Sequence, residues 1–126
     1  MVEEKLWYKS YVPGVKPHLA YEKLTVSAAL TRSVQNFPEH TALNYMGNRI
    51  SYAALDRHVN AFARALSDLG IKPGDKVAVC LPNIPEAVFA NYAIFRIGAA
   101  TVQVNPLYTE REMAYQLNDS ESRLLV

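Results

Sequence analysis

The chain of 126 residues has little cysteine, little glycine and almost no net charge. The single cysteine, Cys80, excludes a disulfide within the chain and suits a reducing compartment. Thirteen basic and twelve acidic residues give a formal charge of +1, which offers no basis for nucleic-acid binding. The charged start lacks the apolar core of a signal peptide, and polar residues interrupt the apolar stretch 87–104, so it predicts no membrane span. We therefore expect a cytoplasmic protein, and leave open a peripheral contact at the inner face of the membrane.

The motifs of common active sites are also absent. The five glycines form neither Gly-x-Gly-x-x-Gly nor Gly-Lys-Ser/Thr, so no phosphate-cradling loop is predicted. The three histidines are scattered, with no cysteine or carboxylate at metal-ligand spacing. Glu110 and Glu112 resemble an acid–base pair, but the start of a helix explains both. We therefore predict no catalytic, cofactor-binding or metal-binding residue in this chain, and a structural role for Cys80.

The chain is organised around a unit over residues 73–106. The apolar run Val77–Leu81 predicts a buried strand, residues 84–97 a helix ended by Gly98, and Thr101–Val104 a second strand. A strand, helix and strand of this length indicate a βαβ unit, with parallel strands and a right-handed crossover. Ligands of parallel sheets bind beyond the carboxyl ends of the strands. Asn83 and Asn105 stand there as the only substrate-adjacent candidates, and the capping of turns is the alternative role.

Flanking elements follow from caps and periodicity. Thr25, Ser51 and Thr109 are predicted N-caps of helices over residues 26–37, 52–69 and 110–119. Residues 42–45 and 50–52 predict a hairpin with 46–49 as its turn, and 122–126 a further strand. In the helix 52–69 one apolar stripe should be buried, and the polar residues off it should face water; these are Asp56, Arg57, Asn60, Arg64 and Asp68.

Together the elements predict an α/β fold, a mostly parallel sheet built on the βαβ unit with flanking helices and an N-terminal hairpin. Residues 1–24 should form an irregular arm whose aromatic side chains pack on the body, although aromatics mixed with lysines also suit a nucleic-acid or lipid surface. Residues 25–126 should form a subdomain truncated at its C-terminal end. Two features indicate truncation: the helix 84–97 is apolar almost all round, and the chain ends within a strand.

Several segments resemble motifs of the adenylate-forming superfamily. Ile50-Ser-Tyr-Ala-Ala-Leu55 resembles its first core motif, typically Leu-Thr-Tyr-x-Glu-Leu, with Ala54 in place of the usual glutamate. The segment from Gly74 to Asn83 resembles the strand that follows, and the segment 93–106 resembles the second core motif. Residues 105–112 with Tyr115-Gln-Leu-Asn118 are most similar to long-chain fatty-acid–CoA ligases.

This resemblance implies part of the large N-terminal domain of an enzyme that activates a long-chain fatty acid with Mg²⁺ and ATP to an acyl-adenylate, then transfers the acyl group to coenzyme A. The family's catalytic and nucleotide-binding motifs match no residue here, so we expect the chain alone to be inactive. Two alternatives stay open: a self-standing α/β binding or assembly module, and a ligase of an aryl or other carboxylic acid. An exposed sheet edge also predicts a homodimer or an exchange of residues 100–126 between copies.

Overall fold

The computed structural model describes residues 5–126. Apart from a short 3₁₀ helix in the segment expected to be irregular, the elements follow one another in the order expected from the sequence. They are the 3₁₀ helix η1 (Leu6–Ser10), α1 (Val26–Asn36), β1 (Thr41–Tyr45), β2 (Asn48–Ser51), α2 (Tyr52–Asp68), β3 (Lys76–Val79), α3 (Pro85–Arg96), β4 (Ala100–Gln103), α4 (Glu110–Ser120) and β5 (Leu124–Leu125). The fold class is the predicted mixture of helices around a parallel sheet.

A three-stranded parallel sheet in the order β4-β3-β5 forms the centre of the fold. Val77 on β3 pairs with Thr101 on β4 and with Leu124 on β5, which confirms the parallel pairing predicted for the βαβ unit. Three consecutive residues of β3 are buried, namely Val77, Ala78 and Val79. A strand covered on both faces needs such a continuous apolar run, because neither face meets water.

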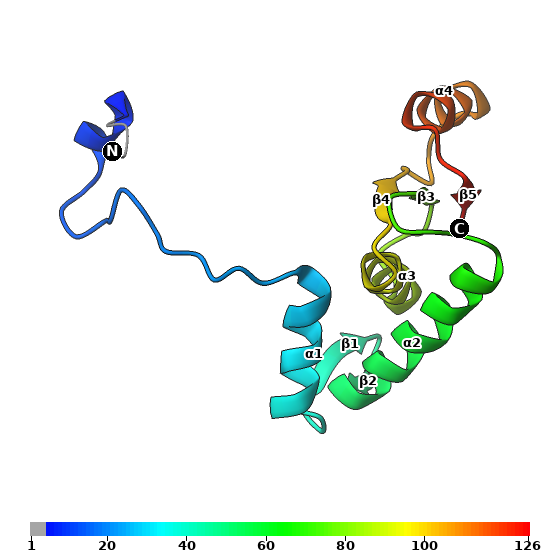
Figure 1. Cartoon of the computed structure of the whole chain (residues 1–126), viewed down its shortest axis with the longest axis horizontal. Coiled ribbons are helices and arrows are strands. Elements are labelled where there is room, and N and C mark those ends of the chain that lie inside the picture. The colour runs from blue at the N-terminus through cyan, green and yellow to red at the C-terminus, as the bar shows by residue number, and fades with distance from the viewer. Residues whose placement is uncertain (1–4) are drawn as a thin grey trace.

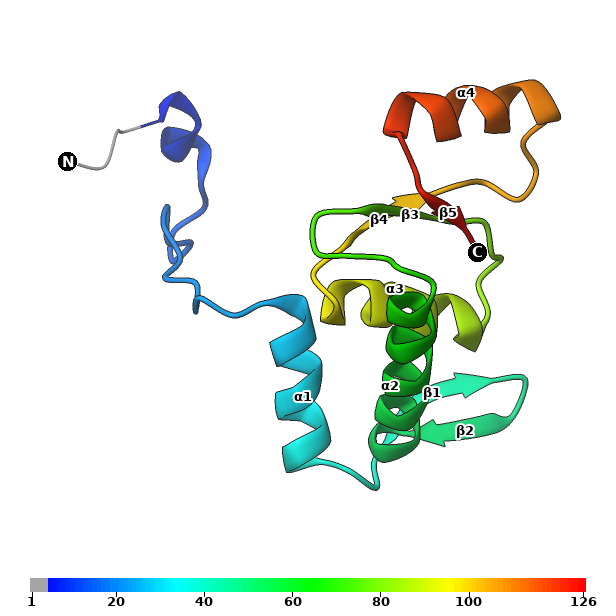
Figure 2. The same cartoon turned by 45° about the vertical axis from the view of Figure 1, so that its right-hand side comes forward.

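Helices lie on both sides of this sheet. In Figures 1 and 2, α3 and α2 lie on one side and α4 lies on the other. The core gathers on the α2–α3 side, where Val59 and Leu66 of α2 and Ile94 of α3 are almost fully enclosed. Helix α4 has no buried residue, so the two sides of the sheet differ in how tightly they are covered.

The apolar helix α3 is buried along one face. Its residues Phe89, Ala90, Ala93 and Ile94 are buried, and α3 contacts α1, α2, β3 and β4. A helix with little polar surface is stable when neighbours cover it on several sides. The other residues of α3 are half-buried or exposed, with Phe95 36% exposed, so these 126 residues bury one face of the helix and not the whole of it, as the sequence indicated.

The hairpin turn is tighter than predicted. Only Met46 and Gly47 connect β1 to β2, both with positive φ, and Asn48 and Arg49 already belong to β2. Two positive φ values are typical of the two-residue turn whose twist matches a hairpin. The three predicted N-caps are confirmed, since Thr25, Ser51 and Thr109 each accept a backbone N–H of the first helical turn.

The N-terminal segment does not pack on the body. Residues 5–24 run away from α1 in Figure 1, with Trp7 57% and Tyr21 82% exposed. Its ring contacts are local, between Tyr8 and the rings of Trp7, Tyr11 and His18. The prediction that these aromatics cover the body was therefore wrong.

Across residues 5–126, none of the helices combines the length and the apolar character that a bilayer span requires.

Candidate functional site

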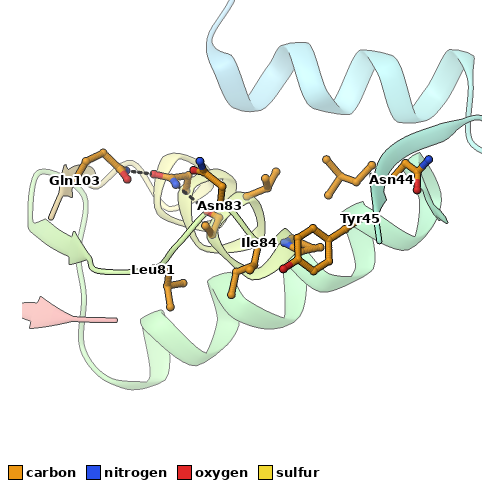
Figure 3. A pocket seen from close by; sticks show the side chains of 11 residues that line it. Asn44, Tyr45, Leu81, Asn83, Ile84 and Gln103 are labelled. Atoms are coloured by element: carbon orange, nitrogen blue, oxygen red, sulfur yellow. Dashed lines mark hydrogen bonds between the residues drawn. The ribbon is translucent and has the colours of Figure 1, made fainter. Parts of the chain in front are cut away.

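A pocket of about 350 Å³ lies where the sequence places a site, beyond the carboxyl end of β3. The hairpin forms one wall, and the loop after β3 with the first turns of α3 forms the other. Figure 3 shows Asn44 and Tyr45 of the hairpin opposite Leu81, Asn83 and Ile84 of the loop. The lining is completed by Leu43, Pro85, Ala87, Val88, Asn91 and Gln103.

Two prolines shape the loop that forms the second wall. Strand β3 ends at Val79, two residues earlier than predicted, and Cys80 is half-buried beyond it, donating its N–H to the carbonyl of Val126 (2.8 Å). Pro82 cannot donate to a strand ladder, and Pro85 occupies the first turn of α3, where an N–H is not required. The chain therefore turns sharply between β3 and α3 and leaves space in front of the sheet.

Neutral amides supply the fixed polar groups of the pocket. Gln103 at the end of β4 donates from Nε2 to Oδ1 of Asn91 on α3 (2.5 Å), and Asn91 donates to the carbonyl of Ala87 (2.7 Å). Gln116 of α4 in turn donates to the carbonyl of Gln103 (2.8 Å). Sequence reasoning missed Asn91 and Gln103. A signal existed, because Asn91 is a polar residue within an otherwise apolar helical segment.

The two asparagines singled out from the sequence are separated. Asn83 is exposed and lines the pocket. Asn105 does not line it, and its Oδ1 instead accepts the N–H of Leu107 (3.0 Å), which makes an Asx turn before α4. The structure thus brings Asn83 near Asn91 and Gln103, and gives Asn105 the local role of stabilising a turn.

The profile of the family described as "AMP-binding enzyme" matches residues 30–126. The chain belongs to this family of AMP-binding enzymes. It is 33% identical over 126 residues to a long-chain-fatty-acid–CoA ligase of Bacillus subtilis, covering 100% of this chain and 22% of the relative. It is 34% identical over 125 residues to the ligase of the same name from Escherichia coli O6:H1, covering 98% of the chain and 22% of the relative. This member of the family therefore spans about a fifth of the length of those ligases.

Proteins with other names are similar to this chain as well. A linear gramicidin synthase of Brevibacillus parabrevis is 29% identical over 127 residues, which is 100% of this chain and 2% of that protein. The Klebsiella oxytoca NpsA N-terminal subdomain in complex with 3-hydroxyanthranilyl-AMSN superposes with a TM-score of 0.78 at 29% identity, covering 81% of this chain and 26% of that one. O-succinylbenzoate coenzyme A synthetase from B. subtilis, in complex with AMP, superposes with a TM-score of 0.74 at 32% identity. The match covers 76% of this chain and 25% of that one.

The residues that line this pocket do not by themselves fit ATP with its metal. A triphosphate requires cationic side chains and clustered backbone N–H donors. The pocket lining contains no lysine, arginine or glycine. Within residues 5–126 no group of three histidine, cysteine or carboxylate side chains is placed to hold a metal ion. We therefore derive no catalytic step through ATP from these residues.

Two carboxyl groups away from the pocket have lowered pKa values, and the structure shows the cause of each. The pKa of Asp75 is lowered because its carboxylate accepts the backbone N–H of Lys72 and lies beside Arg123. The pKa of Glu112 is lowered because its carboxylate accepts from the hydroxyl and the N–H of Thr109, the N-cap of α4. Both carboxylates stabilise the start of an element, which matches the expected capping role of Glu112.

Proposed function

We propose that this chain is part of a long-chain fatty-acid–CoA ligase, which activates a fatty acid with Mg²⁺ and ATP to acyl-AMP and transfers the acyl group to coenzyme A. The chain acts as scaffold in that enzyme. Support comes from the relatives that bear this activity in their name and align over 98–100% of the chain at 31–34% identity. The relative that is a gramicidin synthase is less similar, at 29%.

The chemistry of the pocket supports a scaffolding role. Its polar groups are amides and one phenol, and no charged side chain faces the opening. Neutral amides hold a chain segment or a polar ligand by hydrogen bonds, but they cannot balance the charge of a triphosphate. The residues that bind ATP, Mg²⁺ and coenzyme A therefore lie in the part of the enzyme beyond this chain.

A ligase of aryl acids is the second candidate, because a specific comparison favours it. The synthetase of O-succinylbenzoate is 32% identical over the matched part, close to the values for the fatty-acid ligases. The choice between the acids rests on the relatives alone.

The deciding experiment compares three acids as substrates of the protein encoded by the longest reading frame that contains residues 1–126. The purified product is assayed for acid-dependent exchange of pyrophosphate into ATP with palmitate, benzoate and alanine, and then for acyl-CoA formation. We expect palmitate to give the highest kcat/KM and the 126-residue chain alone to give no exchange. Preference for benzoate or alanine would contradict the fatty-acid substrate, and exchange by the isolated chain would contradict its role as scaffold.

A further inference from the structure

The segment that follows β4 contains no buried residue. We call residues 105–126, which comprise α4, β5 and the loop before them, the strap. Every buried residue of the described chain lies between Leu30 and Val104. Residues 105–112 are exposed without exception, and the rest of the strap is at most half-buried. A segment with so little enclosed surface opens at a lower free energy than the core does.

Two ion pairs hold the strap to the start of β3. Arg123 Nη1 lies 2.9 Å from Oδ2 of Asp75, and Lys76 Nζ lies 3.2 Å from Oε2 of Glu121. The Asp75 side chain is 18% exposed, but the other three side chains are between 41% and 82% exposed. Charges that face water in this way attract each other less when dissolved salt screens them. The attachment of the strap therefore depends on the salt concentration.

Hydrogen bonds and two half-buried side chains supply further contacts of the strap. Val126 donates its N–H to the carbonyl of Ala78 (2.9 Å), and Gln116 of α4 donates to the carbonyl of Gln103 (2.8 Å). Leu124 and Val126 are half-buried against the core cluster. Helix α4 lies on the far side of the sheet from that cluster (Figure 2). The hold on the sheet is thus shared between α4 and β5, so that the release of one element weakens the hold of the other.

The boundary between the strap and the body falls after Val104. This residue is 4% exposed and donates its N–H to the carbonyl of Val79 (2.9 Å), which fixes the end of β4. Asn105 and Pro106 follow it and are exposed. Pro106 has no N–H with which to continue the ladder. Strand β4 can therefore stay paired with β3 when the strap leaves the sheet.

We propose that the strap opens from the sheet as one unit while the core of α2, α3 and β3 stays folded. Opening releases the left-handed backbone of Glu121, whose φ of +54° is unfavourable for a residue with a side chain. Helix α4 has 11 residues, a length that is marginal for a helix alone in water, so it unfolds once it leaves the sheet. The open state exposes one edge of β3, because the strand order is β4-β3-β5. This device goes beyond the proposed function, since it does not depend on which acid is activated.

Hydrogen exchange of the whole 126-residue chain, followed residue by residue by NMR, tests the proposal. Under conditions in which the exchange rate reports the population of the open form, we expect the protected amides of α4 and β5 to share one opening constant. This constant should exceed that of the α2 amides of Val59 and Leu66 by at least about tenfold. Raising the salt from about 0.05 M to about 1 M should increase the exchange of the strap, relative to α2, by about two- to tenfold.

A double-mutant cycle on the ion pair of Arg123 identifies what controls the opening. Arg123→Gln and Asp75→Asn should each raise the opening constant by about two- to fivefold, and the double variant by no more than the larger single effect. Asp75→Asn keeps an oxygen that can accept the N–H of Lys72. The control is the same cycle on the exposed pair of α2, with Arg64→Gln and Asp68→Asn. It should leave the exchange of the strap within about 1.5-fold of the parent.

Three results would overturn the proposal. The first is a common exchange rate for the strap and α2, which would mean that the chain opens only by global unfolding. The second is exchange at β5 more than about tenfold faster than at α4, which would mean that the end frays and the strap is not a unit. The third is a cycle with no coupling between Arg123 and Asp75, or a control cycle that speeds the exchange of the strap as much.

Discussion

Replacing Asp56 by alanine should destabilise the fold far more than its surface position on α2 suggests. Arg96 of α3 donates from Nη1 to Asp56 (2.8 Å) and to Asn60 (2.6 Å), and the side chains of Arg96 and Asp56 are only 18% and 27% exposed. Without Asp56 the guanidinium keeps one neutral acceptor. Stranding a largely buried charge in this way costs about 2–3 kcal/mol.

Replacing the arginine of this pair should lower the free energy of unfolding by less. Arg96→Met keeps the packing of the stem and removes Nη2, which is buried without a hydrogen-bond partner. Asp56 then retains the Nδ2 donor of Asn60 (2.9 Å) and partial contact with water. We expect a loss of about 1 kcal/mol or less, because a buried ion pair replaced by an apolar side chain is often nearly neutral.

Urea unfolding followed by far-UV circular dichroism measures these differences, since Trp7 in the arm does not report on the core. The pair Arg64–Asp68 on the same helix is the control, because its atoms are 3.8 Å apart and its side chains are 85% and 71% exposed. Asp68→Ala should cost under about 0.5 kcal/mol. The reasoning fails if Arg96→Met is as costly as Asp56→Ala, or if Asp56→Ala matches Asp68→Ala.

Three further predictions concern the backbone, the core and acid stability. Gly98→Ala should cost about 1–2 kcal/mol in urea unfolding, since its φ is +76° and a Cβ would lie 3.2 Å from the Pro73 side chain; a cost at or below that of Gly47→Ala, which has open space, would argue against the contact. Ile94→Val should lower the free energy of unfolding by about 0.5–1.5 kcal/mol, because Ile94 is fully enclosed. The lowered pKa of Asp75 stabilises the fold above its ordinary value near 3.8, and this stabilisation is lost as pH falls through the folded-state pKa. Asp75→Asn should therefore flatten the acid side of the stability profile, and an unchanged slope below about pH 4 would refute this.

Local signals in the sequence were sufficient to predict most helices and strands. Ser51 and Thr109 have side-chain oxygens suited to a helix start, and each accepts the predicted N–H. The apolar run after Gly74 has no polar alternation, and β3 is indeed buried on both faces. Such features depend on residues close in the chain, so they can be inferred without knowing the rest of the fold.

Features that depend on distant partners were missed. Asp56 was expected in water but is half-buried, because the crossing of α2 by α3 brings Arg96, 40 residues later, to it. Asn60 is exposed as expected, although it also accepts a hydrogen bond from Arg96. The amide pair Asn91–Gln103 likewise needs α3 to lie against β4. The prediction that the N-terminal segment packs on the body failed for the opposite reason. An apolar composition predicts burial, but it does not supply a surface to pack on.

The position of the pocket follows from where the core ends. Three buried residues of β3 require cover on both faces, and that cover stops at Val79. The prolines then turn the chain toward α3, so the walls on either side are held by the hairpin and by a helix with a fully buried face. Amides suit this half-enclosed place because each can be satisfied by a neighbour, whereas a lone charge would lack a partner. In residues 5–126 the displaced carboxyl pKa values fall on Asp75 and Glu112, at element starts rather than in the pocket. The two carboxylates with lowered pKa values therefore stabilise local structure, whereas the side chains that line the pocket at the sheet end are uncharged.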